Sequence, residues 1–439
     1  MTILERRQLA VFLIFVVSVL CARLGSASDT AKSAVMPNIL VLLADDLGWG
    51  DIGLHGGVAR TPNIDRLAQE GVELHRYYAY PFCSPTRAAM LTGQMPRRFG
   101  IVQALQARDP GLPAGLPTLP GTLKFAGYQT MLVGKWHLGN SSHPLNSGFD
   151  DFYGFLGPEI DYYAHTSRNR QVDWQRNGKT IQEPGYSTFL FADEASSLIE
   201  ERDVGRPFFL QISFNAPHFP FAAPPEYEAK YPNLSRPAVT RVAMIDALDN
   251  AIGRILETLD EQGLRQNTLV MFLSDNGADQ AGRNAPFRGS KGSTFEGGIH
   301  VPCLIRWPPE IAAGSVCEQP VTAQDLYPTL VAAAGLSLEN EKELDGKNLW
   351  PSIRYGKEQN RGPFLISAAN SALFDENWKF IEMNDGRTML FEIIKDPGEL
   401  RDLILEQPAI AERLQTRLSE IKQTFPPAPS RRPPPGRPQ

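Results

Sequence analysis

Two unbroken apolar runs, residues 38–44 and 268–274, mark the centre of the fold. Uninterrupted runs of this length are typical of strands buried on both faces of an α/β sheet. Further strands are expected at 130–133 and 207–214. Residues 238–259 carry apolar side chains at three- and four-residue steps, which predicts an amphipathic helix. The pattern therefore predicts an α/β fold in which a large sheet lies between helices.

The pattern of apolar residues changes near residue 355, where short apolar segments separated by turns replace the long runs. Strands are expected at 363–367, 378–383 and 389–394, and a closing helix at 407–425. We therefore predict a large domain over residues 37–355 and a smaller C-terminal subdomain over 356–425, built from a small sheet and one helix. No internal repeat is found.

The two ends of the chain differ from the rest. Arg6-Arg7 precede a short apolar run, and small residues follow at Gly25-Ser26-Ala27, so residues 1–27 are interpreted as a secretory signal peptide. The run is shorter than the roughly 20 residues that a membrane span needs. A secreted or periplasmic protein without a stable membrane span is expected. Residues 426–439 are rich in proline and arginine and are expected to form a disordered tail.

The composition is that of a globular protein, with 42% hydrophobic and 21% charged residues. Removal of residues 1–27 takes away three arginines and one glutamate, so the formal net charge goes from −6 to −8. A nucleic-acid partner is excluded on this charge, and an anionic substrate would have to be held by a local cluster of cations. Cys83, Cys303 and Cys317 remain, too few for a disulfide framework. Cys303 and Cys317 are either a pair or two core thiols.

Each long apolar run ends in a pair of oxygen-bearing side chains, Asp45-Asp46 after the first and Asp275-Asn276 after the second. Ligands of open α/β sheets collect beyond the carboxyl ends of strands. Carboxylate and amide oxygens are typical ligands of Ca²⁺ or Mg²⁺, whereas zinc prefers histidine or thiolate ligands. A single pair of this kind often only starts a turn or caps a helix. Two pairs after two buried strands favour a metal site.

Cys83-Ser84-Pro85-Thr86-Arg87 is the stretch with the clearest chemistry. Pro85 suits the first turn of a helix, which Gly93 would end, so Cys83 is expected at a helix N-terminus. Backbone N–H groups and the helix dipole favour an anion there, and Arg87 follows one turn later. A cysteine in an ordinary loop–helix junction is the plainer interpretation of an isolated residue.

Four further residues stand where they could contact an anion. Lys135 and His137 would project from one face if the strand at 130–133 continues. His218 follows the strand at 207–214, and Lys291 lies in a glycine-rich loop directly after the second metal pair. Each is weak evidence alone, because surface pairs, satisfied histidines and glycine-rich loops are common. The other histidines have no such context.

Cys83-x-Pro85-x-Arg87 with Leu91-Thr92-Gly93, together with residues 127–139, resembles the signatures of the type I sulfatases. Thr86 stands where that family usually has Ser or Ala. Residues 148–155 and 161–163 resemble the arylsulfatase B type, the N-acetylgalactosamine-4-sulfatases. The resemblance implies an alkaline-phosphatase-like fold, a large mixed sheet between helices with a small C-terminal antiparallel sheet plus helix.

The resemblance also implies a mechanism for hydrolysis of sulfate esters on a sulfated sugar. A formylglycine-generating maturation enzyme would oxidise Cys83 to formylglycine, whose hydrate attacks sulfur. Ca²⁺, with Mg²⁺ as the alternative, would be held by residue 83 together with Asp45, Asp46, Asp275 and Asn276. His137 would take a proton from the hydrate, His218 and Lys291 would assist the leaving oxygen, and Lys135 and Arg87 would offset the developing charge.

Two other functions remain open on the sequence. Related enzymes on this fold hydrolyse phosphate or phosphonate esters, and a glycan-binding protein without catalysis is a third interpretation. The complete set of Cys83, metal pairs and Lys135-His137 argues against the last.

Overall fold

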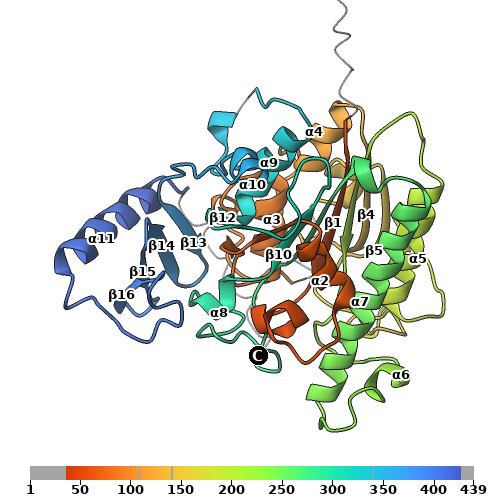
Figure 1. Ribbon diagram of the computed structural model, residues 1–439, viewed down its shortest axis with the longest axis horizontal. Coiled ribbons are helices and arrows are strands. Elements are labelled where there is room, and N and C mark those ends of the chain that lie inside the picture. The colour runs from red at the N-terminus through yellow and green to blue at the C-terminus, as the bar shows by residue number, and fades with distance from the viewer. Residues whose placement is uncertain (1–35, 107–108, 140–141, 340, 427–439) are drawn as a thin grey trace, which may run out of the picture. The chain divides into compact units, whose positions relative to one another are not determined.

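The computed structural model describes residues 36–106, 109–139, 142–339 and 341–426 (Figure 1). The predicted signal peptide and the predicted tail, apart from Pro426, lie outside the described residues. Contacts divide the chain after Met36, and the helices and strands of the described residues all lie in the unit that begins at Pro37.

A mixed sheet forms the centre of the fold. Its strand order, within the described residues, is β11-β2-β10-β9-β1-β8-β4-β5-β6-β7. β9, β1, β8, β4 and β5 run parallel, whereas β10 is antiparallel to β9. The bounds are β1 (Asn38–Ala44), β2 (Val72–Leu74), β4 (Gln129–Lys135), β5 (Asp151–Phe155), β6 (Gln175–Arg176), β7 (Lys179–Thr180), β8 (Phe208–Ser213), β9 (Thr268–Ser274), β10 (Cys303–Arg306) and β11 (Ser315–Cys317). The parallel strands therefore present their carboxyl ends at one edge, as the sequence predicted.

Helices cover both faces of this sheet. Figure 1 shows α5 and α7 on one face and α3, α4 and α9 on the other. The helix bounds are α2 (Pro62–Gln69), α3 (Cys83–Thr92), α4 (Leu119–Phe125), α5 (Ser187–Glu200), α6 (Pro225–Glu228), α7 (Ala238–Glu261), α8 (Glu296–Ile299), α9 (Leu326–Ala333), α10 (Trp350–Tyr355) and α11 (Pro408–Gln423). Short 3₁₀ helices are η1 (Trp49–Asp51), η2 (Gly53–His55), η3 (Pro96–Phe99), η4 (Pro144–Asn146), η5 (Arg265–Asn267), η6 (Ala323–Asp325) and η7 (Glu341–Glu343). Among the described residues, no helix combines the length and the apolar character needed to cross a membrane.

The predicted amphipathic helix at 238–259 is confirmed as α7, which ends two residues later. Ile245, Leu248 and Ile252 are almost fully buried and pack in one cluster with the apolar side chains of β1 and β8. The core of the large sheet therefore lies between α7, α5 and the parallel strands, and it holds the carboxyl ends of those strands in place.

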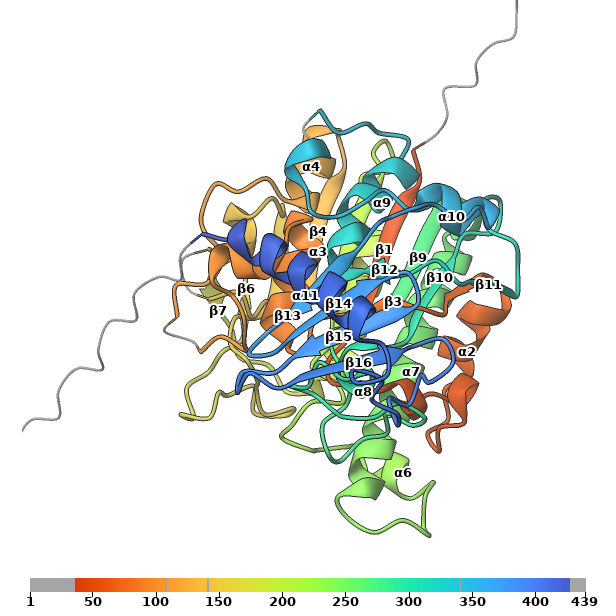
Figure 2. The ribbon, with the colours of Figure 1, turned by 90° about the vertical axis from the view of Figure 1, so that its left-hand side faces the viewer.

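A second, antiparallel sheet follows in the order β13 (Phe364–Ser367), β14 (Ser371–Asp375), β15 (Trp378–Glu382) and β16 (Thr388–Glu392). Figure 2 shows α11 lying across it, and Leu414 and Leu418 of α11 pack on Leu373 and Phe380. The small sheet with one helix is confirmed. β14 was not predicted, because its five residues follow β13 after a tight turn and show no separate apolar run.

The open question of Cys303 and Cys317 is settled by the sheet order. Both are buried free thiols. Leu304 and Ile305 of β10 pair with Glu73 and Val72, and Cys317 of β11 pairs with Leu74, so strand β2 lies between the two cysteines. Two strand spacings separate their Cα atoms by about 9–10 Å, which is beyond the reach of a disulfide. A further two-stranded pair, β3 (Tyr77–Tyr78) with β12 (Val321–Thr322), completes the described strands.

Gly134 allows β4 to approach β8 closely beside Lys135. Its φ is 99°, and a Cβ there would lie 2.0 Å from the carbonyl oxygen of Ser213. Gly127 has a φ of 98°, but a Cβ added there would have no atom of the described residues within 4 Å. The two glycines share backbone strain and differ in the space around them, which makes Gly127 a matched control.

We expect Gly127→Ala to lower the free energy of unfolding by about 1–2 kcal/mol, the cost of a left-handed residue with a Cβ. Gly134→Ala adds a collision with β8, for which overpacked sites suggest roughly 1–3 kcal/mol more. Urea unfolding of both variants measures the difference. Equal losses would show that the close approach at Gly134 does not matter.

Candidate active site

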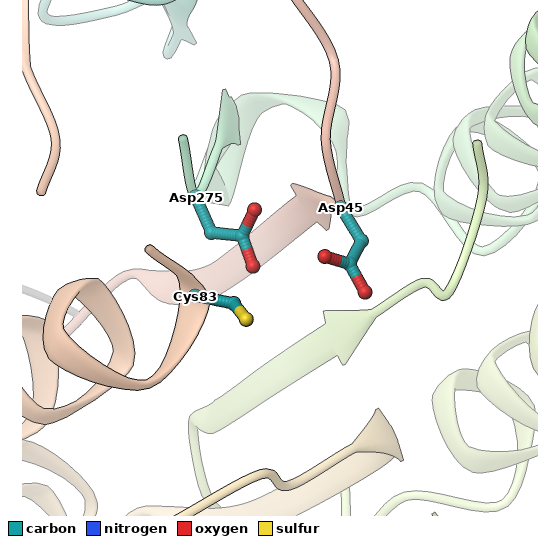
Figure 3. A group of neighbouring side chains, drawn as sticks. All are labelled: Asp45, Cys83 and Asp275. Atoms are coloured by element: carbon teal, nitrogen blue, oxygen red, sulfur yellow. The ribbon is translucent and has the colours of Figure 1, made fainter. Parts of the chain in front are cut away.

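Three buried side chains meet at the carboxyl edge of the large sheet. Asp45 follows β1, Asp275 follows β9, and Cys83 is the first residue of α3. One ligand atom from each lies within 4.8 Å of the others. Figure 3 shows the two carboxylates and the sulfur facing the same space. The structure thus brings together both strand ends and the cysteine, although they are far apart in the sequence.

Asp46 and Asn276 lie beside this group. The Asn276 side-chain amide donates to Asp46 Oδ1 at 2.7 Å, and a second group of ligand atoms, from Asp45, Asp46 and His218, lies within 4.8 Å. Asp45 Oδ1 and Asn276 Oδ1 are buried acceptors without a hydrogen-bond partner among the described residues. Buried acceptors are normally satisfied. Orphaned hard oxygens in a cluster of carboxylates fit a divalent cation of the Ca²⁺ or Mg²⁺ type.

Lys135 and Arg87 form ion pairs with two of the carboxylates, Asp45 and Asp275. Lys135 Nζ lies 2.5 Å from Asp45 Oδ2, and Arg87 donates from Nη2 to Asp275 Oδ2 at 2.7 Å and from Nη1 to the Lys135 carbonyl at 3.0 Å. Burial and the charge of Asp45 raise the pKa of Asp275 to about 6, although Arg87 opposes the rise. Lys135 and Arg87 therefore offset part of the cost of burying two neighbouring carboxylates.

Cys83 occupies the predicted helix N-terminus, and α3 ends at Gly93 in the left-handed region. The thiol is 1% exposed, and burial raises its pKa although Lys135 and Lys291 oppose the rise. The Thr86 hydroxyl accepts from the Tyr80 amide at 2.8 Å. Thr86 thus binds the segment that precedes α3. The residue that differs from the usual Ser or Ala of the family therefore has a structural role.

His137 does not continue the strand, contrary to the expectation that it and Lys135 project from one extended face. β4 ends at Lys135, and His137 has a φ of 55°. Its Nε2–H donates to the Leu105 carbonyl at 2.8 Å, because a carbonyl can only accept. Burial and the charge of Lys135 hold the pKa of His137 well below its usual range. Nδ1 is buried and has no hydrogen-bond partner within the described part of the chain, so its lone pair can accept a proton.

His218 stands in the turn after β8, with Nε2 at 3.7 Å from Asp46 Oδ2. Nδ1 donates to the Phe219 carbonyl at 2.5 Å, so Nε2 is the nitrogen that faces the site. Burial lowers the pKa of His218 to about 4, although Asp46 opposes the shift. The Tyr162 hydroxyl donates to the carbonyls of Asn215 and His218 at 2.6 and 2.9 Å and fixes this turn.

Lys291 reaches the site from the glycine-rich loop. Its Nζ lies 2.7 Å from Asp46 Oδ1, its amide donates to the Ala278 carbonyl at 2.9 Å, and the next amide, of Gly292, donates to Pro81 at 2.8 Å. Burial lowers the pKa of Lys291, but the nearby Asp46, Cys83 and Asp45 together outweigh burial and raise that pKa. For Asp46, the charges of His218 and Lys291 outweigh burial and lower the pKa. Both partners stay charged at neutral pH.

Two supporting residues were missed by the sequence analysis. Arg241 of α7 donates to the Asp51 carboxylate at 2.8 Å and to the Asp46 carbonyl at 2.8 Å. Asp46 has a φ of 65°, an uncommon conformation for a residue with a Cβ. The pair Arg241–Asp51 holds Asp46 in this conformation. The available signal was a charged residue on the apolar face of α7, one turn before Ile245.

Comparison with known proteins extends these observations. The family model for sulfatases matches residues 37–336. The N-acetylgalactosamine-6-sulfatase of Homo sapiens is 38% identical over 359 residues, which cover 75% of this chain and 68% of that protein. Arylsulfatase J of Mus musculus is 31% identical over 459 residues, covering 88% and 76%. The predicted 4-sulfatase type is not confirmed by these relatives, the first of which is named a 6-sulfatase.

Solved structures agree with the alkaline-phosphatase-like fold. Ps i-CgsB, solved in complex with k-i-k-neocarrahexaose, has a TM-score of 0.84 and 32% identity, covering 90% of this chain and 94% of that chain. The phosphonate monoester hydrolase of Agrobacterium radiobacter has a TM-score of 0.67 at 22% identity, covering 88% and 95%, and is similar in fold alone. The family match and the curated relatives show that this chain belongs to the sulfatase family, the hydrolases of sulfuric esters.

Proposed function

We propose that this protein removes sulfate from a sulfated sugar, with residue 83 as the nucleophile after its oxidation to formylglycine by a maturation enzyme. The observation that carries the proposal is the placement of Cys83 at a helix N-terminus beside Asp45 and Asp275. Helix N–H groups and the cations Lys135 and Lys291 surround the same point, which suits a nucleophile that attacks an anion.

The cation expected in this family would be held by Asp45, Asp46, Asp275 and Asn276 together with residue 83. Ca²⁺ is proposed ahead of Mg²⁺, because a larger ion accepts many oxygen ligands in a flexible geometry. When bound, a divalent cation polarises a sulfate ester and lowers the pKa of a coordinated hydroxyl. The orphaned oxygens of Asp45 and Asn276 support this assignment.

The remaining side chains would have two roles, the neutralisation of charge and the transfer of protons. Lys135 and Arg87 are fixed by Asp45 and Asp275 and would neutralise charge that develops at the reacting centre. His137 is neutral with Nδ1 free, so it would take a proton from residue 83.

Lys291 and His218 would face the leaving oxygen. Asp46 raises the pKa of Lys291, so Lys291 carries a proton at neutral pH and is the ready donor. His218 has a pKa near 4 and would orient the leaving group until a bound sulfate anion favours its protonated form.

The sugar is proposed to carry an N-acetylgalactosamine 4-sulfate or similar unit. The relatives support a sugar sulfate: one is named N-acetylgalactosamine-6-sulfatase, and another was solved with k-i-k-neocarrahexaose. Phe152, Tyr153 and Phe155 in the segment resembling the arylsulfatase B type are buried in β5 and form core. The preference for the 4-position therefore depends on residues 161–163, where Tyr163 is 45% exposed and Tyr162 fixes the His218 turn.

We also propose that the protein acts outside the cytoplasm, as a secreted or periplasmic enzyme. The pattern of residues 1–27 supports this location.

Cys83→Ala and Cys83→Ser remove the source of the aldehyde and change little volume. We expect turnover to fall on the order of 10³-fold or more in either variant, with the melting temperature nearly unchanged. Steady-state assays and thermal melts measure this, and mass spectrometry of the peptide spanning position 83 reports conversion in the parent protein. Parent-like rates in either variant would remove formylglycine from the mechanism.

Elemental analysis is expected to find one Ca²⁺ or Mg²⁺ per chain, lost together with activity on exhaustive chelation. Asp45→Asn and Asn276→Ala should weaken metal binding, because each removes or weakens an oxygen ligand. Asp385→Asn is the control, since Asp385 pairs with Arg387 on the surface of the second sheet. Stoichiometric zinc, or full activity after chelation, would contradict the assigned site.

Substrate choice is tested with N-acetylgalactosamine 4-sulfate and 6-sulfate, and with one aryl alcohol as its sulfate and its phosphate. We expect the sulfate to be hydrolysed faster than the phosphate. The 4-sulfate should exceed the 6-sulfate in kcat/KM by about tenfold or more, the discrimination that 1–3 kcal/mol of pocket contacts provides. A faster phosphate would favour the phosphoryl hydrolase, and a faster 6-sulfate would transfer the specificity to that position.

A further inference from the structure

A buried ion cluster connects the second sheet to the loop that carries Lys291. Lys379 of β15 places its Nζ 2.8 Å from Glu296 Oε1 and 2.8 Å from Glu399 Oε1. All three side chains are at most 1% exposed. Charged groups are rarely buried so completely unless they are paired, so this cluster is a built feature of the fold.

His300 completes the cluster. Its Nε2 donates to the His75 carbonyl at 2.6 Å, and its Nδ1 lies 2.8 Å from Glu296 Oε2. Both ring nitrogens of His300 therefore lie within hydrogen-bond distance of an oxygen, one of a carbonyl and one of Glu296. Glu296 is therefore fixed from two directions, by Lys379 and by His300.

The cluster closes the neck of the glycine-rich loop. The Gly297 amide donates to the Arg288 carbonyl at 2.7 Å and so joins the two ends of the segment 288–297. Glu399 contacts both ends: its Oε2 accepts from the Glu296 amide at 2.7 Å, and its carbonyl accepts from Arg288 Nη1 at 3.0 Å. Glu399, in the loop that follows β16, thus contacts both ends of the 288–297 segment.

The tip of the same loop lies at the candidate active site. Lys291 is three residues from Arg288, and its Nζ is 2.7 Å from Asp46 Oδ1. The Gly292 amide donates to Pro81, two residues before Cys83. A loop fixed at its neck and at two backbone points in its tip has little freedom to move its lysine.

We propose that Lys379 and Glu399 are positioning residues for the reaction: they clamp the neck of the 288–297 loop and thereby place Lys291 against the reacting group. The inference rests on the proposed role of Lys291. It gives the second sheet an indirect part in the reaction, through the loop that carries Lys291.

The clamp also has a pH dependence. Burial and the charge of Glu296 raise the pKa of Glu399 to about 7, although Lys379 opposes the rise. The folded protein therefore binds a proton that the unfolded chain, with an ordinary glutamate pKa of 4.5, gives up earlier. The protonated Glu399 therefore stabilises the folded protein fully below pH 4.5. This stabilisation is lost as the pH rises to about 7, because the ionised carboxylate is buried beside Glu296.

The groups that face Glu399 come from several elements. They are Lys379 of β15, Glu296 of α8 with His300 behind it, and Arg288 of the loop; Tyr78 and Arg76 lie beyond Glu296. In Glu399→Gln the group stays neutral at every pH and keeps its shape.

The first experiment is a double-mutant cycle between Lys379→Met and Lys291→Ala. We expect Lys379→Met to lower kcat/KM at least tenfold in the parent protein and less than twofold when Lys291 is already alanine. Lys395→Met is the control, because Lys395 is 76% exposed and pairs with Glu392 at the end of the same sheet, and it should leave kcat/KM unchanged. Equal losses in both backgrounds would show a general structural effect and overturn the proposal.

The second experiment uses Glu399→Gln, which preserves shape if Lys379→Met fails to fold. We expect the parent protein, but not Glu399→Gln, to show faster hydrogen exchange of amides 288–298 as the pH rises from 5 to 8, after correction for intrinsic exchange. Identical pH dependence in the two proteins would overturn the clamp.

Hydrogen exchange also separates the clamp from the proposed function. If Lys291→Ala alone keeps full activity, the catalytic role of Lys291 fails and the positioning proposal with it. A difference in exchange between the parent and Glu399→Gln would then leave a loop clamp without a catalytic consequence. If Lys291→Ala loses activity but Lys379→Met keeps full activity, the positioning proposal is overturned directly.

Discussion

The structure depends most on the concentration of buried negative charge where β1 and β9 end. Asp45, Asp46 and Asp275 lie together with almost no exposure to solvent. Three carboxylates cannot stay ionised there without nearby cations, because burial and mutual repulsion favour the neutral forms. Lys135, Arg87 and Lys291 supply these cations from three different elements. The positions of β4, α3 and the glycine-rich loop are thus tied to the same electrostatic requirement.

The same requirement explains why the site has several layers of support. Arg241 and Asp51 hold the backbone of Asp46 from the α7 side. The Lys379–Glu399 cluster holds the loop of Lys291 from the side of the second sheet. Catalytic geometry has to be kept to within fractions of an ångström, and long side chains such as lysine gain that precision only when the backbone that carries them is fixed.

Proton positions are determined by the same surroundings. His137 and His218 each donate one ring N–H to a carbonyl, and this leaves the other nitrogen as an acceptor in the site. Burial keeps both neutral, whereas the carboxylate beside Lys291 keeps that lysine charged. The two histidines and Lys291 therefore differ in their protonation states, and in the proposed mechanism this difference would separate the proton acceptor from the proton donor.

The sequence determined the elements and most members of the site, because apolar runs, the helix breaker Pro85 and the Asp45-Asp46 and Asp275-Asn276 pairs act locally. It did not determine what depends on distant contacts. The turn at His137, the strand β2 between Cys303 and Cys317, the support by Arg241, and the pairing of Glu296 with Lys379 are set by packing between segments far apart in the chain. A charged residue in an apolar pattern, such as Arg241 or Lys379, signals only that a partner exists. Only the tertiary structure decided which partner it is, because buried charge is stabilised by whichever opposite charge the fold brings within reach.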